Sequence, residues 1–299
     1  MKLTHLILIS AACASICTGC GYKNSHNGDP TTDKLSVAVS VEPQRYILNQ
    51  LLDSSQVAIS TLITPGANPE TYELTPRKRM DLEHSDIYLS TGVLPFEEAI
   101  TSTLSVPVAD SSRGITFVYG SHGESCGHSH EAGAHHHDSA PDPHIWTSVE
   151  NVRIMASNMA TAIAHIRPEM QATLQERLNT FNLRLDSIDS SIRRRLADAD
   201  SCFIIWHPSL SYFARDYDLE QIAVGFESKE MPAGRLRQII DHAAASKASV
   251  FFFQQEFDSR QAKGVNDMLG SRLVVINPLS SDWEGQIDII TDALTQSQK

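Results

Sequence analysis

The sequence predicts an α/β fold of two lobes, with mainly parallel sheets wrapped by helices and one long helix joining the lobes. Three observations support this prediction. Short apolar runs alternate with helical segments, the pattern of parallel sheets covered by helices. These runs fall into two sets along the chain. The polar stretch between the sets, residues 150–200, carries the apolar stripe of an α-helix.

The chain begins with the features of a secretory signal, expected at residues 1–19. Lys2 is followed by a twelve-residue apolar run, residues 6–17, which is too short to span a bilayer. The ending at Cys20 resembles a bacterial lipobox, in which that cysteine is acylated, although Cys17 stands where Leu is commoner. We expect residues 20–33 to be a lipidated tether, with an ordinary signal peptide cleaved elsewhere as the alternative.

Composition limits the function classes. Cys126 and Cys202 are the cysteines left after the lipobox, so no disulfide framework is expected, and Cys202 is predicted to be buried. The net charge of -12 argues against nucleic acid and favours cations. No later apolar run is long enough to cross a bilayer, so we expect the protein to meet the membrane through its lipid anchor only, in the periplasm or at the cell surface. We also expect a monomer.

The first lobe is expected at residues 34–166. Its predicted strands are residues 35–41, 57–63 and 87–91, and its predicted helices include residues 45–52 and 77–83. Within it, residues 120–143 have no strand or helix signal. This His-rich loop contains six clustered histidines, a composition typical of transition-metal binding. They are His122, His128, His130, His135, His136 and His137.

The linking helix is expected at residues 167–198. Apolar side chains recur every three or four positions from Met170 to Leu196, and Pro168 suits a first helical turn. A helix over residues 168–197 would be about 45 Å long, enough to connect two lobes. The alternative is a helical hairpin with residues 149–165 and no bridging role.

The second lobe is expected at residues 199–299. Residues 202–206, 250–253 and 273–276 are its predicted strands, and residues 235–245 form a predicted helix. Ligands of open α/β sheets bind beyond the carboxyl ends of the strands. His207 and Asn277 directly follow two strands here, and Glu70 lies in the loop after a strand of the first lobe.

With His144, these residues would face one another across a cleft between the lobes and form a metal site there. Each one alone has another interpretation. A lone His is more often a packing or capping residue, Glu70 could be a solvated loop carboxylate, and Asn277 before Pro278 could be a turn former.

Four segments carry a family resemblance: PGANPETYE at 65–73, DPHIW at 142–146, HPSLSYFARDY at 207–217 and NPL at 277–279. In residues and order they resemble the metal-site blocks of the zinc and manganese solute-binding proteins of bacterial ABC importers, the ZnuA-like and TroA-like family. The resemblance implies two α/β lobes joined by a rigid helix, and a His-rich loop before the Asp-Pro-His block is a mark of the zinc members.

Two positions depart from the zinc pattern. Glu70 stands where His is usual, and Asn277 stands where Asp is usual. The site gains the carboxylate of Glu70 and loses that of the usual Asp, so its total charge is unchanged. The resemblance therefore implies Glu70, His144 and His207 as ligands, with Asn277 as the candidate fourth. Two His and one carboxylate suit zinc, and they also suit iron or manganese.

The sequence thus predicts a lipoprotein that binds Zn²⁺ tightly and delivers it to an ABC permease and its ATPase, with no enzymatic role. Its affinity should fall below about pH 6.5, where His protonates. The His-rich loop is expected to capture additional zinc. The alternatives are a manganese or iron importer protein, a metal buffer or adhesin, and a zinc hydrolase, for which no His-Glu-x-x-His motif occurs.

Overall fold

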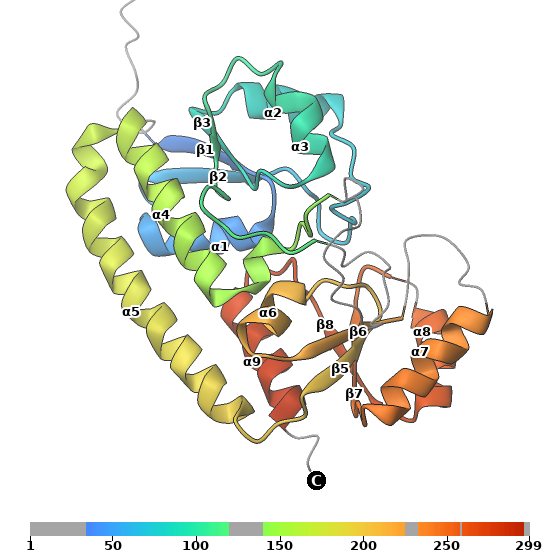
Figure 1. Cartoon of the computed structure of the whole chain (residues 1–299). Coiled ribbons are helices and arrows are strands. Elements are labelled where there is room, and N and C mark those ends of the chain that lie inside the picture. Colours follow the sequence, from blue (N-terminus) through green and yellow to red (C-terminus); the bar gives the residue numbers. More distant parts are fainter. Residues whose placement is uncertain (1–33, 120–139, 225–232, 258, 296–299) are drawn as a thin grey trace, which may run out of the picture. The chain divides into compact units, whose positions relative to one another are not determined.

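The computed structural model describes residues 34–119, 140–224, 233–257 and 259–295. The predicted signal and tether, Cys20, the six clustered histidines and Cys126 lie outside these residues. Within the described residues, no helix combines the length and apolar character that crossing a membrane requires. Two four-stranded sheets, both fully parallel in their pairing, form the framework (Figure 1).

The first lobe contains the sheet of order β2-β1-β3-β4. Its elements are β1 (Leu35–Val39), α1 (Glu42–Leu51), β2 (Val57–Thr61), α2 (Pro76–Glu83), β3 (Ile87–Ser90), α3 (Pro95–Thr101) and β4 (Val108–Asp110). Every residue of β3 is buried, as expected for a parallel strand covered on both faces. Thr75 starts α2 by accepting a hydrogen bond from the Lys78 backbone.

A helical pair separates the two sheets in the chain. It consists of α4 (Val149–Ile166) and α5 (Gln171–Leu196), joined by a 3₁₀ turn at Pro168–Met170. The two helices pack on each other, and α5 also contacts α1 of the first lobe and α9 of the second (Figure 1). The chain therefore has both features that the sequence left as alternatives: a hairpin, and a long helix in contact with both lobes.

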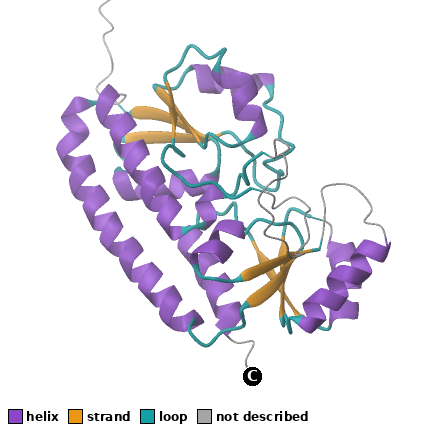
Figure 2. Cartoon of the chain, viewed as in Figure 1, coloured by secondary structure: helices purple, strands orange, loops and turns teal. Residues whose placement is uncertain are grey.

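The second lobe repeats the alternating pattern around a sheet of order β6-β5-β7-β8 (Figure 2). Its elements are β5 (Cys202–Ile205), α6 (Ser211–Asp216), β6 (Glu220–Ala223), α7 (Ala233–Ala245), β7 (Val250–Gln254), α8 (Ser259–Leu269), β8 (Arg272–Ile276) and α9 (Trp283–Thr295). The predicted two-lobe α/β fold is confirmed.

The hydrophobic core continues from the first lobe into one face of the second sheet. Phe203, Phe252 and Trp283 belong to the same cluster of buried side chains as the first sheet, α4 and α5. The opposite face of the second sheet, with Phe251 and Phe253, forms a separate cluster with α7 and α8. The outer helices are therefore packed independently of the core that both lobes share.

Reciprocal tryptophan hydrogen bonds connect the lobes next to the Asp-Pro-His segment. The indole N–H of Trp146 donates to the Pro278 carbonyl, and that of Trp283 donates to the Trp146 carbonyl. Trp283 also stacks on Tyr46 of α1, with ring centroids 5.4 Å apart. Buried aromatic rings with satisfied polar groups combine large apolar contact with a fixed orientation, so this contact fixes part of the lobe interface.

Two strands were missed by the sequence prediction, β4 and β6. Both lie at sheet edges and lack an apolar run: β4 has three residues, and β6 includes Glu220 and Gln221. An edge strand needs no continuous apolar side chains, because one side faces solvent.

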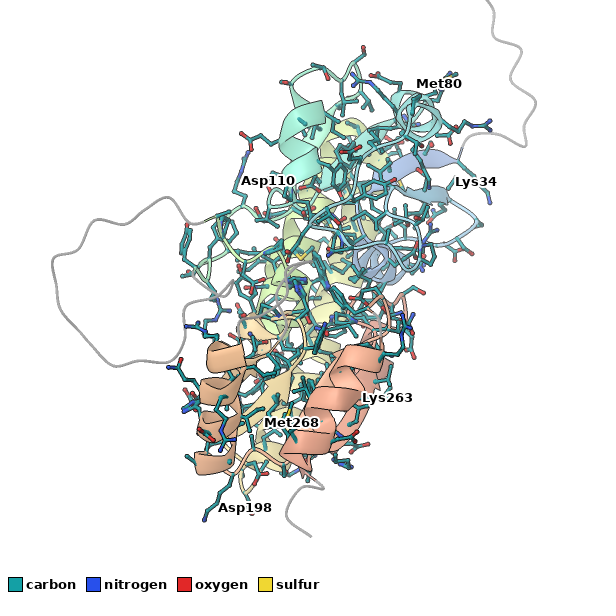
Figure 3. The ribbon with its side chains drawn as sticks, turned by 90° about the vertical axis from the view of Figure 1, so that its right-hand side faces the viewer. Lys34, Met80, Asp110, Asp198, Lys263 and Met268 are labelled. Atoms are coloured by element: carbon teal, nitrogen blue, oxygen red, sulfur yellow. The ribbon has the colours of Figure 1, made fainter. Side chains whose placement is uncertain are left out.

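Some apolar side chains stay outside the core, such as Met80 and Met268, which are 60% and 56% exposed (Figure 3).

Candidate metal centre

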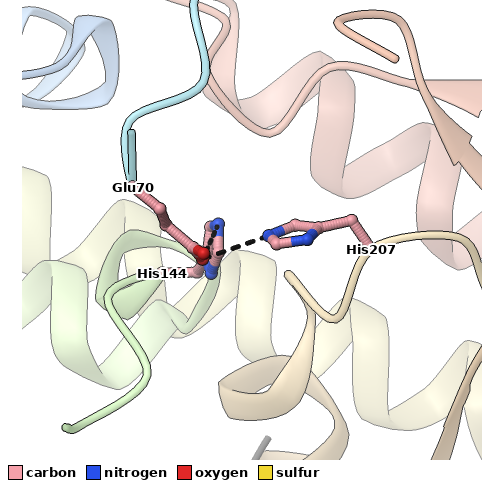
Figure 4. A group of neighbouring side chains, drawn as sticks. All are labelled: Glu70, His144 and His207. Atoms are coloured by element: carbon pink, nitrogen blue, oxygen red, sulfur yellow. Dashed lines mark hydrogen bonds and ion pairs between the residues drawn. The ribbon is translucent and has the colours of Figure 1, made fainter. Parts of the chain in front are cut away.

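Glu70, His144 and His207 lie together where the lobes meet (Figure 4). Each offers one ligand atom, and these atoms lie within 4.8 Å of one another. The side chains are 9%, 4% and 5% exposed, respectively. In the described part of the chain, one group of three or more His, Cys, Asp or Glu side chains has a spacing that could hold a metal ion, and it is this group. Residues separated by 137 positions thus meet at one point.

Glu70 is positioned by the loop after β2. The Ala67 backbone N–H donates to the Thr64 carbonyl, which closes a turn containing Pro65 and Gly66. Gly66 has φ of +83°, a conformation that glycine adopts without strain. The side chain of Asn68 then accepts a hydrogen bond from the Glu70 backbone N–H at 2.9 Å. The PGAN sequence therefore shapes the loop that presents the carboxylate.

His144 is held by the aspartate two residues before it. The Asp142 carboxylate accepts hydrogen bonds from the backbone N–H and the Nδ1–H of His144, each at 2.9 Å. This fixes the tautomer with Nε2 free, and Nε2 lies 3.8 Å from Glu70 Oε1. Burial alone would lower the pKa of His144. The bond and charge of Asp142, with the charges of Glu70 and Glu256, outweigh it and raise the pKa.

The segment that carries Asp142 and His144 is fixed at several points. The Tyr212 hydroxyl, from α6 of the second lobe, donates to the Asp142 carbonyl at 2.8 Å. Ser148 caps α4 by accepting a hydrogen bond from the Asn151 backbone N–H. Hydrogen bonding to the imidazole holds the pKa of the buried Asp142 carboxyl below its usual value, despite burial. A charged Asp142 therefore accompanies His144.

His207 follows β5, as the sequence predicted. Its backbone N–H donates to the Gln254 side-chain carbonyl at 3.2 Å, and the Gln254 amide donates to the His207 carbonyl. The ring packs beside Phe257, with centroids 5.2 Å apart. Its Nε2 lies 3.1 Å from Glu70 Oε1. A hydrogen bond between these two atoms joins the lobes.

The other candidates take different positions. The Asn277 side-chain oxygen accepts a hydrogen bond from the Leu279 backbone N–H at 3.1 Å, as a turn-forming Asn does. Cys202 is buried, and burial raises the pKa of its thiol to about 11. His84 and His165 are exposed, while His242 pairs with Glu220 at 2.8 Å. The accessory histidines lie outside the described residues.

Sequence reasoning missed Glu256. It follows β7 in the segment QQEF and is half-buried. Burial raises the pKa of its carboxyl, and the charge of His144 opposes that rise. No sequence motif surrounds this Glu. Its position just after a predicted strand of the second lobe could have indicated it, because the same criterion identified His207.

The group has the chemistry of a transition-metal site. Two imidazole nitrogens and a carboxylate are an established ligand set for zinc, with a fourth position for another ligand or water. The Asp142 bond occupies Nδ1 of His144, so Nε2 is the nitrogen that could ligate a metal ion, and hydrogen bonding of this kind increases the basicity of a ligating imidazole. The donor set, with the Asp142 carboxylate bonded to His144, therefore fits a divalent metal ion.

The fold and this group define a class of protein: two-lobe α/β binding proteins with a metal-type ligand group where the lobes meet. Comparison with known proteins identifies the family. Residues 37–296 match the family model of ZnuA, the periplasmic component A of the zinc-uptake complex. The chain belongs to this family.

Individual relatives agree with this assignment. The chain is 25% identical over 283 residues to the high-affinity zinc uptake system protein ZnuA of Bacillus subtilis, covering 91% of this chain and 88% of that protein. It is 22% identical over 283 residues to the zinc-binding lipoprotein AdcA of Streptococcus pneumoniae, covering 92% of this chain. It spans about half the length of AdcA, 55%.

Solved structures give the same result. A crystal structure of ZnuA superposes with a TM-score of 0.78 and 26% identity, covering 89% of this chain and all of that one. A zinc-bound deletion mutant of ZnuA has the same TM-score and identity, and covers 89% of this chain and 98% of its own. The predicted family is therefore confirmed.

Proposed function

We propose that this protein binds Zn²⁺ outside the cytoplasmic membrane and delivers it to an ABC permease and its ATPase. The observation that carries the proposal is the convergence of Glu70, His144 and His207 to within 4.8 Å. The ion is the cargo, held by ligands from both lobes. Release of the ion then requires a change in the contacts between the lobes or in the positions of the ligands. Docking on the permease would cause this change.

Zinc is the preferred cargo because of the donor set. Imidazole nitrogen favours zinc over the harder manganese ion, and two of the three proposed ligands are imidazoles. Zinc is also named for the family and for the relatives described above. The family match does not favour the alternatives of a manganese or iron importer protein, or of a metal buffer or adhesin. A competition titration with Zn²⁺, Mn²⁺ and Fe²⁺ distinguishes the cargoes.

The proposed placement is a lipoprotein anchored to a bacterial membrane through Cys20. The lipobox-like sequence supports the anchor, and AdcA, a relative, is named a lipoprotein. Metabolic labelling with a radioactive fatty acid tests it: Cys20→Ser should remove the label. The anchored protein would act as a monomer toward its permease, which sedimentation of the soluble domain checks.

Carriage is favoured over catalysis. A zinc hydrolase needs a bound water and a general base beside the metal. In this group the one carboxylate, Glu70, is a proposed ligand, and the family is one of solute-binding proteins. Hydrolysis of ester, peptide and phosphoester substrates by the zinc-loaded protein should not exceed that by a Glu70→Ala variant.

The His-rich loop, residues 120–143, is proposed to hold additional zinc and to raise its concentration near His144. The described residues at its two ends support this. Tyr119 pairs with Pro141 in an antiparallel bridge, and the Asp142 backbone N–H donates to the Val118 carbonyl at 2.8 Å. The loop therefore starts and finishes beside the proposed site. Deleting residues 121–138 should leave one tight site and lower the zinc stoichiometry; an unchanged stoichiometry would contradict the role.

The decisive experiment is metal analysis of protein purified without chelators, paired with Glu70→Ala. The exposed Glu73 lies in the same loop and provides the control, Glu73→Ala. We expect one tightly held zinc in the wild type and in the control, and loss of that tight zinc in Glu70→Ala. Full retention of tight binding by Glu70→Ala would overturn the proposed site.

A further inference from the structure

The strand order of the second lobe places the turn after β7 beside His207. β5 and β7 are parallel neighbours, with Ile205 paired to Phe252. Adjacent strands lie about 4.8 Å apart, so their carboxyl ends present neighbouring loops. Residues 254–257 form a turn, closed by a hydrogen bond from the Phe257 backbone N–H to the Gln254 carbonyl. Glu256 lies within this turn.

Both ends of this turn contact His207. Gln254 exchanges hydrogen bonds with the His207 backbone, and the Phe257 ring packs beside the imidazole. Glu256 is therefore carried by a segment that is fixed to a proposed ligand on either side of it. A Glu side chain has three rotatable bonds, so a change of rotamer can redirect the Glu256 carboxylate from this turn.

Glu256 is partly withdrawn from solvent and interacts electrostatically with His144, a proposed ligand. The carboxylate is half-buried, and burial raises its pKa. The charge of the His144 imidazole acts on the Glu256 carboxylate and opposes the rise in its pKa. A desolvated carboxylate gains stability from a cation nearby, and a divalent ion at His144 supplies twice the charge of a protonated imidazole.

Resting on the proposed function, we propose that Glu256 is a further ligand of the bound metal ion and the second carboxylate of the site. Its carboxylate is not within the three-residue group whose ligand atoms lie within 4.8 Å of one another. It enters the coordination sphere by a change of side-chain rotamer when the ion binds. The site then consists of two imidazoles and two carboxylates, with two ligands from each lobe.

This assignment bears on cargo preference. Hard ions such as Mn²⁺ prefer oxygen ligands, whereas zinc takes both nitrogen and oxygen ligands. A second carboxylate therefore adds affinity for both ions and widens the range of metals that the site can hold. Asn277, whose amide oxygen is used in a turn, is not required as the fourth ligand.

The test compares Glu256→Ala with Glu70→Ala and with Glu73→Ala, which removes one negative charge from an exposed position near the site. Zn²⁺ and Mn²⁺ affinities are measured by chelator competition, and X-ray absorption at the zinc edge counts oxygen neighbours. We expect Glu256→Ala to lower zinc affinity by about 10- to 100-fold or more. Loss of a residue that only orients a ligand already has an effect of this size, and loss of a ligand should have at least the same effect. Glu256→Ala should lower manganese affinity by more and remove an oxygen neighbour, with Glu73→Ala near wild type.

The outcomes separate the two proposals. If Glu256→Ala binds zinc as tightly as Glu73→Ala does, or keeps the oxygen count of the wild type, Glu256 is not a ligand and this inference fails. Loss of tight zinc in Glu70→Ala would in that case leave the proposed function standing. If the wild type itself binds no zinc tightly, the proposed function fails. Thermal melts of the metal-free variants establish that each is folded.

Discussion

The two histidines of the candidate site are held in different ways. His144, in the first lobe, has its ring fixed by the buried Asp142, which sets the tautomer and raises the pKa. His207, in the second lobe, is fixed through its backbone by Gln254, and its ring packs on Phe257. The first lobe thus provides a proposed ligand whose pKa is set by a neighbouring carboxylate, and the second lobe provides one that is held in position through its backbone. The predictions below test this difference.

The largest effect is expected from removing either imidazole. Binding of a structural zinc is worth roughly 10 to 16 kcal/mol, so one of four ligands carries about 2.5 to 4 kcal/mol, a loss of about 70- to 900-fold in affinity. His144→Ala and His207→Ala should both show this loss in chelator competition.

The same two variants should differ in stability. His144→Ala leaves Asp142 buried without its imidazole partner, so its metal-free form should lose about 1 to 3 kcal/mol more than that of His207→Ala. Urea unfolding measures this difference. Equal destabilisation of the two variants would mean that the lobes hold their histidines alike.

Asp142→Asn should weaken zinc binding by about 10- to 100-fold, the usual effect of removing a group that orients a ligating imidazole. An amide keeps the size of the side chain but not the charge that raises the pKa of His144. The midpoint of proton competition should therefore move to lower pH in this variant. A pH midpoint identical to that of the wild type would show that Asp142 acts by position alone.

Zinc affinity should fall as the pH decreases, because the metal displaces a proton from each imidazole. The folded pKa of His144 is raised above 6.5, so competition begins above pH 6.5 and not below it as the sequence alone implied. Affinity should then fall by about tenfold per pH unit for each imidazole that takes up a proton. Chelator competition between pH 5 and pH 8.5 checks this, and a flat profile would exclude imidazole ligation.

Gln254→Ala should have the smallest effect. It removes the side chain that holds the His207 backbone, but changes no charge at the site. Loss of one or two neutral hydrogen bonds of about 1 kcal/mol each predicts a decrease in affinity of at most about 5-fold to 30-fold. The proton-competition midpoint should not move, which distinguishes this variant from Asp142→Asn. A shift in the midpoint would show that the second lobe also tunes its histidine electronically.

The sequence by itself determined the layout of the two lobes. Apolar runs and helical periodicity predicted six of the strands and the long helix, because burial on both faces of a parallel sheet demands such runs. The residue types after those strands predicted Glu70 and His207, and the Asp-Pro-His segment predicted His144. The polar edge strands β4 and β6 were missed because they face solvent on one side.

The tertiary structure decided how those residues act together. Only the packing of the two lobes, through Trp146 and Trp283, brings His207 to 3.1 Å from Glu70. Only the pairing of β5 with β7 reveals that Glu256 belongs beside the site. Side-chain chemistry is written in the sequence, whereas distance, burial and the resulting pKa values depend on contacts between segments far apart in the chain.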